Sequence, residues 1–284
     1  EYVGAEKAAD AAESLNLAIK NYDLGVQVTW QVYTPEEIAA DPELGMVQLF
    51  YFPAEQPNAN YVLVVGGNAH IKTGEFGEAL ASASELHEKG YAVFVLRYRT
   101  FMDAGEDAPL QDILRAMKFI DEHTAQFNVQ REDYALLGYS SGGHIVGLAA
   151  SENKKYGYRQ LGIPAPAAVI LGYPVNDFFE LKPVYSVLMD PSKPCGHYYW
   201  HTVSGEITSN YPPTYVWCGR NDGTLAGMGW NRQVPEIEKA LQDAGVTHQA
   251  VYYDNAGHAV GVGRGTEAEG WIADAVAFWE EQCR

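Results

Sequence analysis

Two serines stand between glycines in the stretch LLGYSSGGHIVGLAAS, which runs from Leu136 to Ser151. A short apolar run precedes them and an apolar-periodic segment follows, so the pattern predicts a strand, a tight turn and a helix. The turn, Gly138-Tyr139-Ser140-Ser141-Gly142, fits G-x-S-x-G, in which glycines permit a sharp and strained serine backbone. In this register Ser140 is the candidate nucleophile, and Ser141 offers its backbone N–H, not its hydroxyl, to developing negative charge. The alternative is a glycine-rich turn without chemistry.

A serine hydroxyl is a poor nucleophile at neutral pH, so it needs a base, and the base needs an orienting carboxylate. Asp222 lies in the loop GRNDG after one predicted strand, and His258 ends the loop NAGH after the next. Ligand-binding groups gather at the carboxyl ends of parallel strands, so we expect both side chains to converge on Ser140. Asp254 lies close to His258 in the sequence and competes as the carboxylate. We favour Asp222, because a residue at the adjacent strand end can reach across to the imidazole.

A third loop, Gly66-Gly67-Asn68-Ala69-His70, directly follows a buried apolar run that ends at Val65. A glycine pair lets backbone N–H groups face a site without an intervening side chain, which is what an oxyanion hole requires. Gly67 or Asn68 is the predicted donor, together with the amide of Ser141. An ordinary Gly-Gly turn is the alternative. We expect His70 to contact substrate or backbone and not to act as the base.

The remaining histidines and aromatic residues suggest binding surfaces or packing. His144 lies one turn into the helix after Ser140, where packing or a hydrogen bond is expected. His197 and His201 have the spacing of a metal pair, but no helix signal and no third ligand accompany them, so we expect no metal. Aromatic residues beside them, with Trp200 among them, favour a wall that binds a sugar or an aryl group. Tyr139 and His70 are further predicted substrate contacts.

Composition narrows the classes of function. The chain has 284 residues, of which 47% are hydrophobic, and a formal net charge of −18. Such a surface repels nucleic-acid phosphates and anionic membranes, so we expect neither as a partner. The three cysteines are too few for a disulfide framework and favour a reducing compartment, which points towards the cytoplasm. The chain begins at Glu1 without a methionine, so processing, and with it a secreted form, stays open.

The elements that must position these loops alternate between strand and helix. Continuous apolar runs in the later strands predict an α/β fold, with a mostly parallel sheet of about eight strands and helices on both faces. The first two strands form an antiparallel edge, and residues 1–284 form one domain. The segment Pro174–Pro212 lacks periodicity and is a long loop or a cap. The expected strands are 26–33, 46–52, 61–65, 91–98, 133–138, 167–173, 213–219 and 248–253; the expected helices are the first ~20 residues, 75–89, 109–123, 141–151, 232–244 and 267–282.

These motifs together resemble the α/β-hydrolase superfamily, and more narrowly the esterase and lipase-like carbohydrate esterases, including bacterial acetyl-xylan and feruloyl-type esterases. The resemblance rests on VVGGNAH, GYAVFVLRYR, GYSSGGHIVGLAAS, PPTYVWCGRNDGTL and YYDNAGHAVGVG, which follow the family's order from Tyr61 to Gly263. The chain order Ser, Asp, His is also that of the α/β-hydrolases. Two departures bear on the acyl and alcohol preferences. No histidine precedes the glycine loop, where Asn68 stands for a common third glycine, and no Val-Pro follows Asp222.

The resemblance implies an α/β-hydrolase fold and a serine esterase that forms an acyl-enzyme on Ser140 without a cofactor or metal. Its implied substrates are short-acyl or hydroxycinnamoyl esters of carbohydrates or related small molecules. A serine peptidase on the same fold is an alternative, but it usually needs an extra domain or an anchor for a peptide terminus. A non-catalytic binding protein would be expected to have lost the serine, the aspartate or the histidine. The sequence leaves the physiological ester and a homo-oligomer open.

Overall fold

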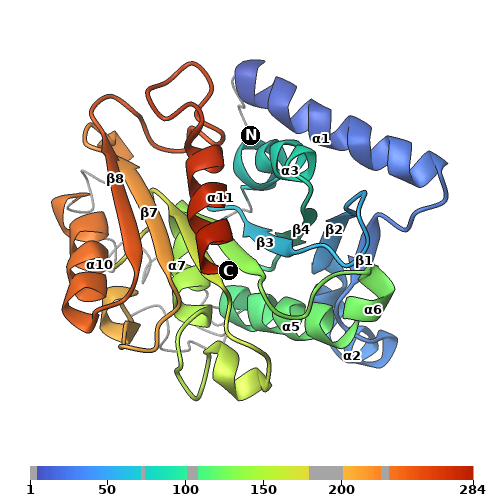
Figure 1. The fold of residues 1–284 in the computed structure, drawn as a ribbon. Helices are drawn as coiled ribbons and strands as arrows, with labels where there is room; N and C mark the ends of the chain where they lie inside the picture. The colour runs from blue at the N-terminus through green and yellow to red at the C-terminus, as the bar shows by residue number, and fades with distance from the viewer. Residues whose placement is uncertain (1–4, 72–73, 101–107, 179–200, 225–229, 284) are drawn as a thin grey trace.

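An eight-stranded sheet runs through the molecule in the order β1-β2-β4-β3-β5-β6-β7-β8 (Figure 1). This computed structural model describes residues 5–71, 74–100, 108–178, 201–224 and 230–283. The pairs β1–β2 and β2–β4 are antiparallel, and all other neighbours are parallel, which confirms the predicted fold class and its antiparallel edge. The strands are β1 (Thr29–Gln31), β2 (Gln48–Phe52), β3 (Tyr61–Val65), β4 (Ala92–Arg97), β5 (Ala135–Tyr139), β6 (Ala168–Gly172), β7 (Thr214–Gly219) and β8 (His248–Tyr253).

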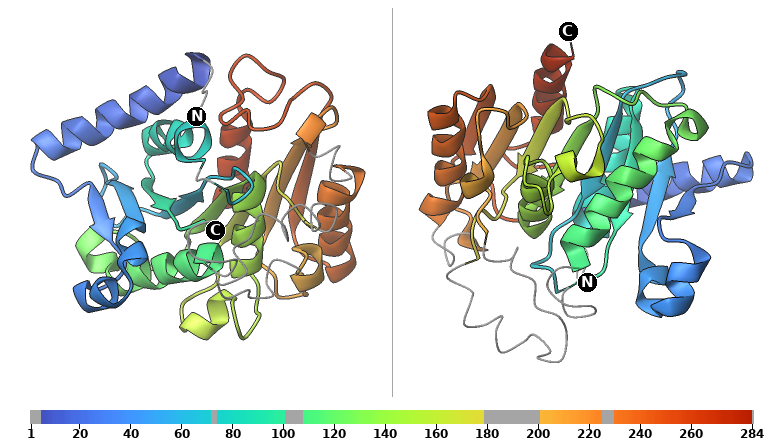
Figure 2. Two further views of the ribbon diagram at one scale, coloured as in Figure 1. Left: turned by 180° about the vertical axis from the view of Figure 1, so that it is seen from behind. Right: turned by 90° about the horizontal axis from the view of Figure 1, so that it is seen from below.

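Helices cover both faces of the sheet (Figure 1). Helices α3 and α11 lie on one face and α5 and α7 on the other, while α10 contacts β7 and β8. Figure 2 shows α1 on the outer side of α3. The α-helices are α1 (Ala5–Asp23), α2 (Pro35–Ala40), α3 (Leu80–Glu88), α5 (Ala108–Glu122), α6 (Thr124–Phe127), α7 (Ser140–Ala149), α10 (Trp230–Ala244) and α11 (Trp271–Gln282). Short helical turns are η1 (Pro42–Met46), η2 (Glu75–Ala79), η3 (Tyr158–Leu161) and η6 (Ser204–Glu206).

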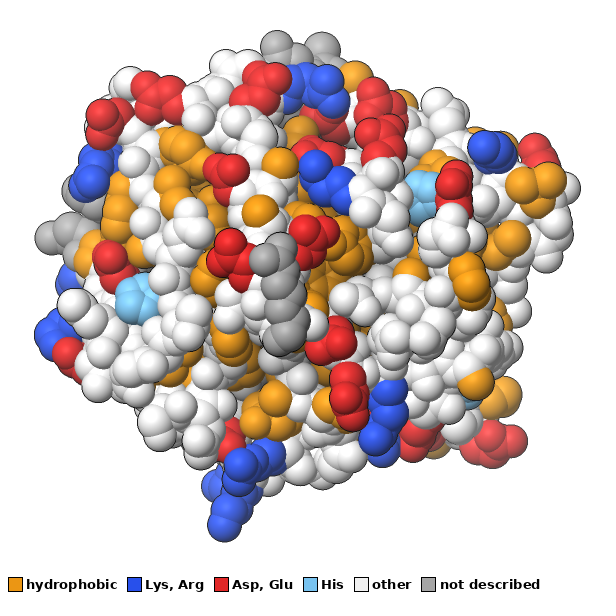
Figure 3. All heavy atoms as spheres, viewed as in Figure 1, with side chains coloured by type: hydrophobic (Ala, Val, Ile, Leu, Met, Phe, Trp, Pro, Cys, Tyr) orange, Lys and Arg blue, Asp and Glu red, His pale blue; other side chains and the backbone are white. Residues whose placement is uncertain are grey.

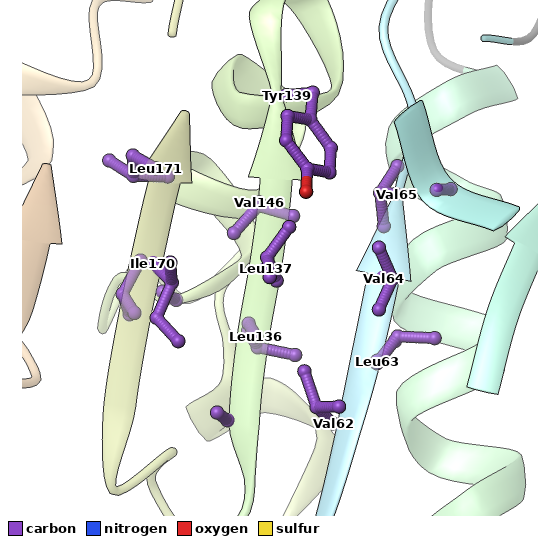
Figure 4. Packing of buried hydrophobic residues seen from close by; sticks show 14 of the residues in the cluster. Val62, Leu63, Val64, Val65, Leu136, Leu137, Tyr139, Val146, Ile170 and Leu171 are labelled. Atoms are coloured by element: carbon purple, nitrogen blue, oxygen red, sulfur yellow. The ribbon is translucent and has the colours of Figure 1, made fainter. Parts of the chain in front are cut away.

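The hydrophobic core lies between the sheet and the helices on its two faces, and the central strands contribute much of it. Every residue of β3, β5 and β6 is buried, as expected for parallel strands covered on both faces. Figure 4 shows aliphatic side chains of β3, β5 and β6 packed against one another and against Val146 of α7. Burial of a large aliphatic side chain contributes about 1.5–3 kcal/mol, so these strands form a rigid support for the loops at their ends.

The structure differs from the sequence-based expectations at several element boundaries, and α2 and α6 lie outside the predicted helices. The first strand is shorter than predicted. The helix expected over 75–89 begins as a π-helical turn, η2, and continues as α3. The last helix begins at Trp271, because Gly270 has a left-handed φ of 92° that a helix cannot include. Most of the segment predicted as a cap or long loop, 179–200, lies outside the described residues; η6 belongs to the described remainder.

The carboxyl ends of β3, β5, β7 and β8 meet at one edge of the sheet, because these strands are mutually parallel. Four segments that carry candidate site residues leave that edge: the loops after β3, β7 and β8, and the turn from β5 into α7. On the face shown in Figure 3, acidic side chains are spread widely and no broad basic patch is visible. Among the described helices none is both long and apolar enough to cross a membrane.

Candidate active site

Ser140 lies where β5 ends and α7 begins. Its φ is 51°, in the left-handed region that residues with a Cβ rarely adopt. Such strain persists only where surrounding structure over-determines it, and it clusters at functional sites. Ser140 is 6% exposed, so its hydroxyl sits in a largely enclosed position at the edge of the sheet.

Two glycines let the loop after β3 approach Ser140. We call this segment, Gly66–Ile71, the glycine loop. A Cβ on Gly67 would lie 2.6 Å from the Cβ of Ser140, and a Cβ on Gly142 would lie 2.5 Å from the Gly66 carbonyl oxygen. Real Cβ atoms do not come this close, so both positions need glycine. The second glycine of G-x-S-x-G therefore serves the contact between α7 and the glycine loop.

Three side chains from three loops form a hydrogen-bonded line at this edge. The Ser140 Oγ lies 2.8 Å from Nε2 of His258, and Nδ1 of the same imidazole lies 2.6 Å from Oδ2 of Asp222. Asp222 is fully buried, and its other oxygen accepts the Thr224 N–H at 3.0 Å. The structure thus brings together the three residues that the sequence analysis selected.

Asp254, the competing carboxylate, lies elsewhere. Its side chain is 78% exposed, and it pairs with Arg220 at 3.3 Å. Arg220 stacks in turn over the ring of Tyr252. Because His258 already directs Nδ1 at Asp222, the structure favours the carboxylate from the adjacent strand end over the one that is close in sequence.

The glycine loop has an unusual backbone. Asn68, Ala69 and His70 have φ values of 82°, 56° and 54°, three consecutive left-handed residues. The N–H of Gly67 donates to Oε2 of Glu78 at 2.6 Å. The prediction that Gly67 is an oxyanion donor is therefore corrected, because a buried carboxylate already accepts its amide. Asn68 remains the candidate donor of this loop.

The hydroxyl of Ser141 has a partner that the sequence did not reveal. It accepts the backbone N–H of His70 at 3.3 Å, so it joins the glycine loop to the start of α7. The hydroxyl of Tyr98 donates to the Gly66 carbonyl oxygen at 2.8 Å and holds the same loop from β4's side. The expectation that only the amide of Ser141 matters is thus incomplete.

Comparisons with known proteins identify the family of this chain. The sequence model of the BD-FAE family matches residues 48–194, which is just over half of the chain. The chain belongs to the BD-FAE family. The matched residues include the glycine loop, Ser140 and Ser141, whereas Asp222 and His258 follow the matched range.

Two curated relatives of this BD-FAE family member have names that refer to xylan or its esters. An acetylxylan esterase from Xylanibacter ruminicola is 22% identical over 250 residues, which are 84% of this chain and 49% of the relative. An endo-1,4-beta-xylanase B from Butyrivibrio fibrisolvens is 25% identical over 184 residues, which are 62% of this chain and 29% of the relative. The chain thus spans no more than about half the length of the curated relatives it matches.

Solved structures show the same fold. An acetyl ester-xyloside bifunctional hydrolase from Caldicellulosiruptor lactoaceticus superposes with a TM-score of 0.72 at 20% identity, covering 89% of this chain and 95% of that one. A truncated carbohydrate esterase from gut microbiota gives a TM-score of 0.68 at 17% identity, covering 91% and 97% of the two chains. Similarity to these structures establishes the α/β-hydrolase fold for this BD-FAE family member.

Two predicted substrate contacts do not reach the site with their side chains. The Tyr139 side chain is fully buried, and its hydroxyl shares a hydrogen bond with Ser82 (Figure 4 shows the ring among aliphatic side chains). His70 is also fully buried, its ring centroid 5.7 Å from that of Phe178. Burial lowers the pKa of His70 well below its ordinary value and so favours the neutral imidazole. The predicted substrate contact of the Tyr139 side chain is corrected. For His70, predicted to contact substrate or backbone, burial disfavours a substrate contact by the ring, and Trp200 lies outside the described residues.

Two residues near the hydrogen-bonded chain of Ser140, His258 and Asp222 were not predicted from the sequence. The ring of Tyr173, just after β6, lies with its centroid 4.9 Å from that of His258. Glu78, in η2, is 4% exposed and binds both the glycine loop and Tyr173. In the sequence, Glu78 stands out only as a charged residue directly before the apolar run Ala79–Ala81. A charged residue at the start of a helix is usually exposed to solvent, so this position did not indicate a buried carboxylate.

The histidine region near the predicted aromatic wall forms a hydrogen-bonded cluster. His201 Nδ1 lies 3.1 Å from Glu206 Oε1 and 2.9 Å from the Tyr156 hydroxyl. His144 is buried in α7, and its Nε2–H donates to the His201 carbonyl oxygen at 2.9 Å. Within the described ranges, no group of three or more His, Cys, Asp or Glu side chains is arranged to hold a metal ion.

Proposed function

We propose that this chain is a serine carboxylic ester hydrolase that works through an acyl-enzyme on Ser140. One observation carries the proposal: Ser140 Oγ, the imidazole of His258 and the carboxylate of Asp222 form a continuous line with links of 2.8 and 2.6 Å. This is the order of nucleophile, base and orienting acid that activates a serine.

In the proposed reaction, Ser140 Oγ attacks the ester carbonyl carbon while Nε2 of His258 takes its proton. The Asp222 carboxylate accepts a hydrogen bond from Nδ1–H, which fixes the tautomer of the imidazole, and its charge stabilises the imidazolium; the Nδ1 proton stays on the ring. The imidazolium then gives its proton to the leaving alkoxide, which departs as the alcohol. Water attacks the acyl-enzyme with His258 again as base, and the acid leaves with Ser140 restored. Every proton in this scheme moves through His258, so the scheme involves no cofactor.

Two backbone amides are the proposed oxyanion donors. Ser141 lies in the first turn of α7, where N–H groups have no acceptor within the helix. Asn68 follows Gly67, whose position against the Cβ of Ser140 places the glycine loop beside the nucleophile. Together these amides would stabilise the tetrahedral oxyanion, and loss of one such donor costs roughly 10²–10³ in kcat.

The proposed substrates are short-acyl or hydroxycinnamoyl esters of carbohydrates or related small molecules. Support comes from the relatives, which include an acetylxylan esterase and an acetyl ester-xyloside hydrolase by name. The formal charge of −18 also favours a neutral substrate over an anionic one.

The test compares wild type with Ser140→Ala on p-nitrophenyl acetate and p-nitrophenyl butyrate. We expect turnover by the wild type only, and a fluorophosphonate probe should label the wild type at Ser140. Equal activity of the two proteins, or no activity and no labelling of the wild type, would contradict the proposal. A panel of acetylated xylan, a feruloyl ester and an aminoacyl amide then separates a carbohydrate esterase from a peptidase.

A further inference from the structure

Glu78 is a buried carboxylate for which the proposed reaction has no chemical step. It lies in η2, the turn after the glycine loop, and is 4% exposed. Its two oxygens accept from different parts of the fold. Oε2 accepts the Gly67 N–H at 2.6 Å, and Oε1 accepts the Tyr173 hydroxyl at 3.0 Å. An ionised carboxylate suits this place, because both partners are donors.

Tyr173 extends this set of contacts to the segment after β8 that contains His258 and Gly261, which we call the histidine loop (residues 255–261). Its hydroxyl accepts the N–H of Gly261 at 3.1 Å, three residues after His258. Its ring also packs against the His258 imidazole with a centroid distance of 4.9 Å. A continuous path therefore runs from the Gly67 amide through Glu78 and Tyr173 to the histidine loop.

A direct contact between the two segments supports this path. Gly261 has a φ of 61°, and a Cβ at this position would lie 2.5 Å from the carbonyl oxygen of Gly77. The residue before Glu78 is thus in close backbone contact with the histidine loop. The glycine loop and the histidine loop are far apart in the sequence, yet both contact the turn that contains Glu78.

The glycine loop needs such support. Its three consecutive left-handed residues, Asn68 to His70, each hold a conformation that costs on the order of 1 kcal/mol or more. The Glu78 carboxylate fixes the amide directly before them, and Ser141 fixes the amide at their end. A buried carboxylate is costly to desolvate, so its presence here favours a role in preorganisation over one in bulk stability.

We propose that Glu78 is a positioning residue that sets the glycine loop and His258 at their working separation, so that the oxyanion donors and the base act on the same substrate carbonyl. This inference rests on the proposed esterase function. It predicts that loss of Glu78 weakens stabilisation of the tetrahedral state more than binding of the ester, because the loops are needed in register mainly when the oxyanion forms.

The experiment uses Glu78→Gln, Glu78→Ala and a matched control, Asp121→Asn. Asp121 is also a buried carboxylate, with its side chain 7% exposed, but it pairs with Arg131 at 2.7 Å near the end of α5, before β5 begins. For each protein we would measure the melting temperature, kcat and KM on p-nitrophenyl acetate, and inhibition by phenylboronic acid. Boronic acids form a tetrahedral serine adduct, so their affinity reports stabilisation of the oxyanion-like state.

We expect Glu78→Ala to lower kcat by roughly 100-fold, with KM changed less than about 3-fold and boronate affinity falling in parallel with kcat. Glu78→Gln keeps an oxygen that can accept the Gly67 N–H, so it should retain about ten times the kcat of Glu78→Ala. Asp121→Asn should lower the melting temperature while kcat stays within about 2-fold of the wild type.

Three results would overturn the inference while leaving the esterase proposal intact. The first is an unchanged kcat in a folded Glu78→Ala variant. The second is a Glu78→Ala variant whose KM rises while its kcat stays the same. The third is a loss of kcat in Asp121→Asn as large as that in Glu78→Ala for the same drop in melting temperature. If instead the wild type hydrolyses none of the esters and resists fluorophosphonate labelling at Ser140, the esterase proposal fails and the role of Glu78 fails with it.

Discussion

The hydroxyl of Ser141 accepts the backbone N–H of His70 at 3.3 Å. The second serine of the motif therefore ties the helix that begins at Ser140 to the loop that offers the proposed oxyanion donor. The neighbouring serines have different partners: Ser140 bonds to His258, and Ser141 bonds to the glycine loop. Substitutions at the two positions should separate chemistry from positioning.

Ser140→Ala should abolish turnover, with a loss of about 10⁴-fold or more in kcat, because no nucleophile remains. Ser141→Ala keeps the amide and loses only the hydroxyl that holds His70. One hydrogen bond contributes roughly 1 kcal/mol, so kcat should fall by about 3- to 10-fold. Steady-state kinetics on p-nitrophenyl acetate measures both, and a Ser141→Ala enzyme as inactive as Ser140→Ala would contradict the division of roles.

Asp222→Asn should lower kcat by about 10³- to 10⁴-fold, because an amide at this position cannot hold the imidazole in the productive tautomer. Asp254→Asn is the matched control, since it changes a 78% exposed carboxylate only four residues before His258. Its kcat should stay within about 2-fold of the wild type. The reverse ranking, with Asp254→Asn the more damaging change, would show that Asp254 and not Asp222 orients the imidazole.

Gly67→Ala should lower kcat by at least about 100-fold while the protein still folds. The new methyl group would lie 2.6 Å from the Cβ of Ser140, so either the glycine loop or the nucleophile must move. Gly45→Ala provides the comparison, because its Cβ would meet only the Ile38 side chain at 3.4 Å. Kinetics and circular dichroism of both variants give the test; a fully active Gly67→Ala enzyme would refute the close approach.

Stability should fall on acidification because of His144. Burial lowers the pKa of this fully buried imidazole to about 4, from an ordinary value near 6.5. The unfolded chain therefore binds more protons between these values, so the contribution of His144 is complete above pH 6.5 and is lost as pH falls towards 4. Between pH 7.5 and pH 5 this loss amounts to about 2 kcal/mol of unfolding free energy.

Urea unfolding of wild type and His144→Gln at pH 7.5 and pH 5 measures this contribution. His144→Gln should be less stable at pH 7.5, because the imidazole packing and its hydrogen bond to the His201 carbonyl oxygen are lost. Its free energy of unfolding should, however, depend less on pH than that of the wild type. His70 stays in both proteins, so the difference between them reports His144. An identical pH dependence in the two proteins would mean that His144 is protonated alike in the folded and unfolded states.

The sequence by itself determined the scaffold. Mostly apolar runs predicted the strands of the parallel sheet, and all six strands from β3 to β8 lie where they were predicted, with boundaries shifted by at most two residues. Parallel strands bring their carboxyl ends to one edge, so the convergence of Ser140, Asp222 and His258 followed from the order of elements and the residues at their ends.

Tertiary structure decided which atoms of those loops meet. Residue type did not separate Asp222 from Asp254, because both follow strands at the same edge; the direction of the side chains separates them. Only the tertiary structure shows that the Gly67 N–H donates to Glu78 and that the Tyr139 ring lies in the core. It also shows that the Ser141 hydroxyl accepts the His70 N–H. Hydrogen bonds depend on directions and distances of a few tenths of an ångström, which packing fixes and sequence periodicity does not encode.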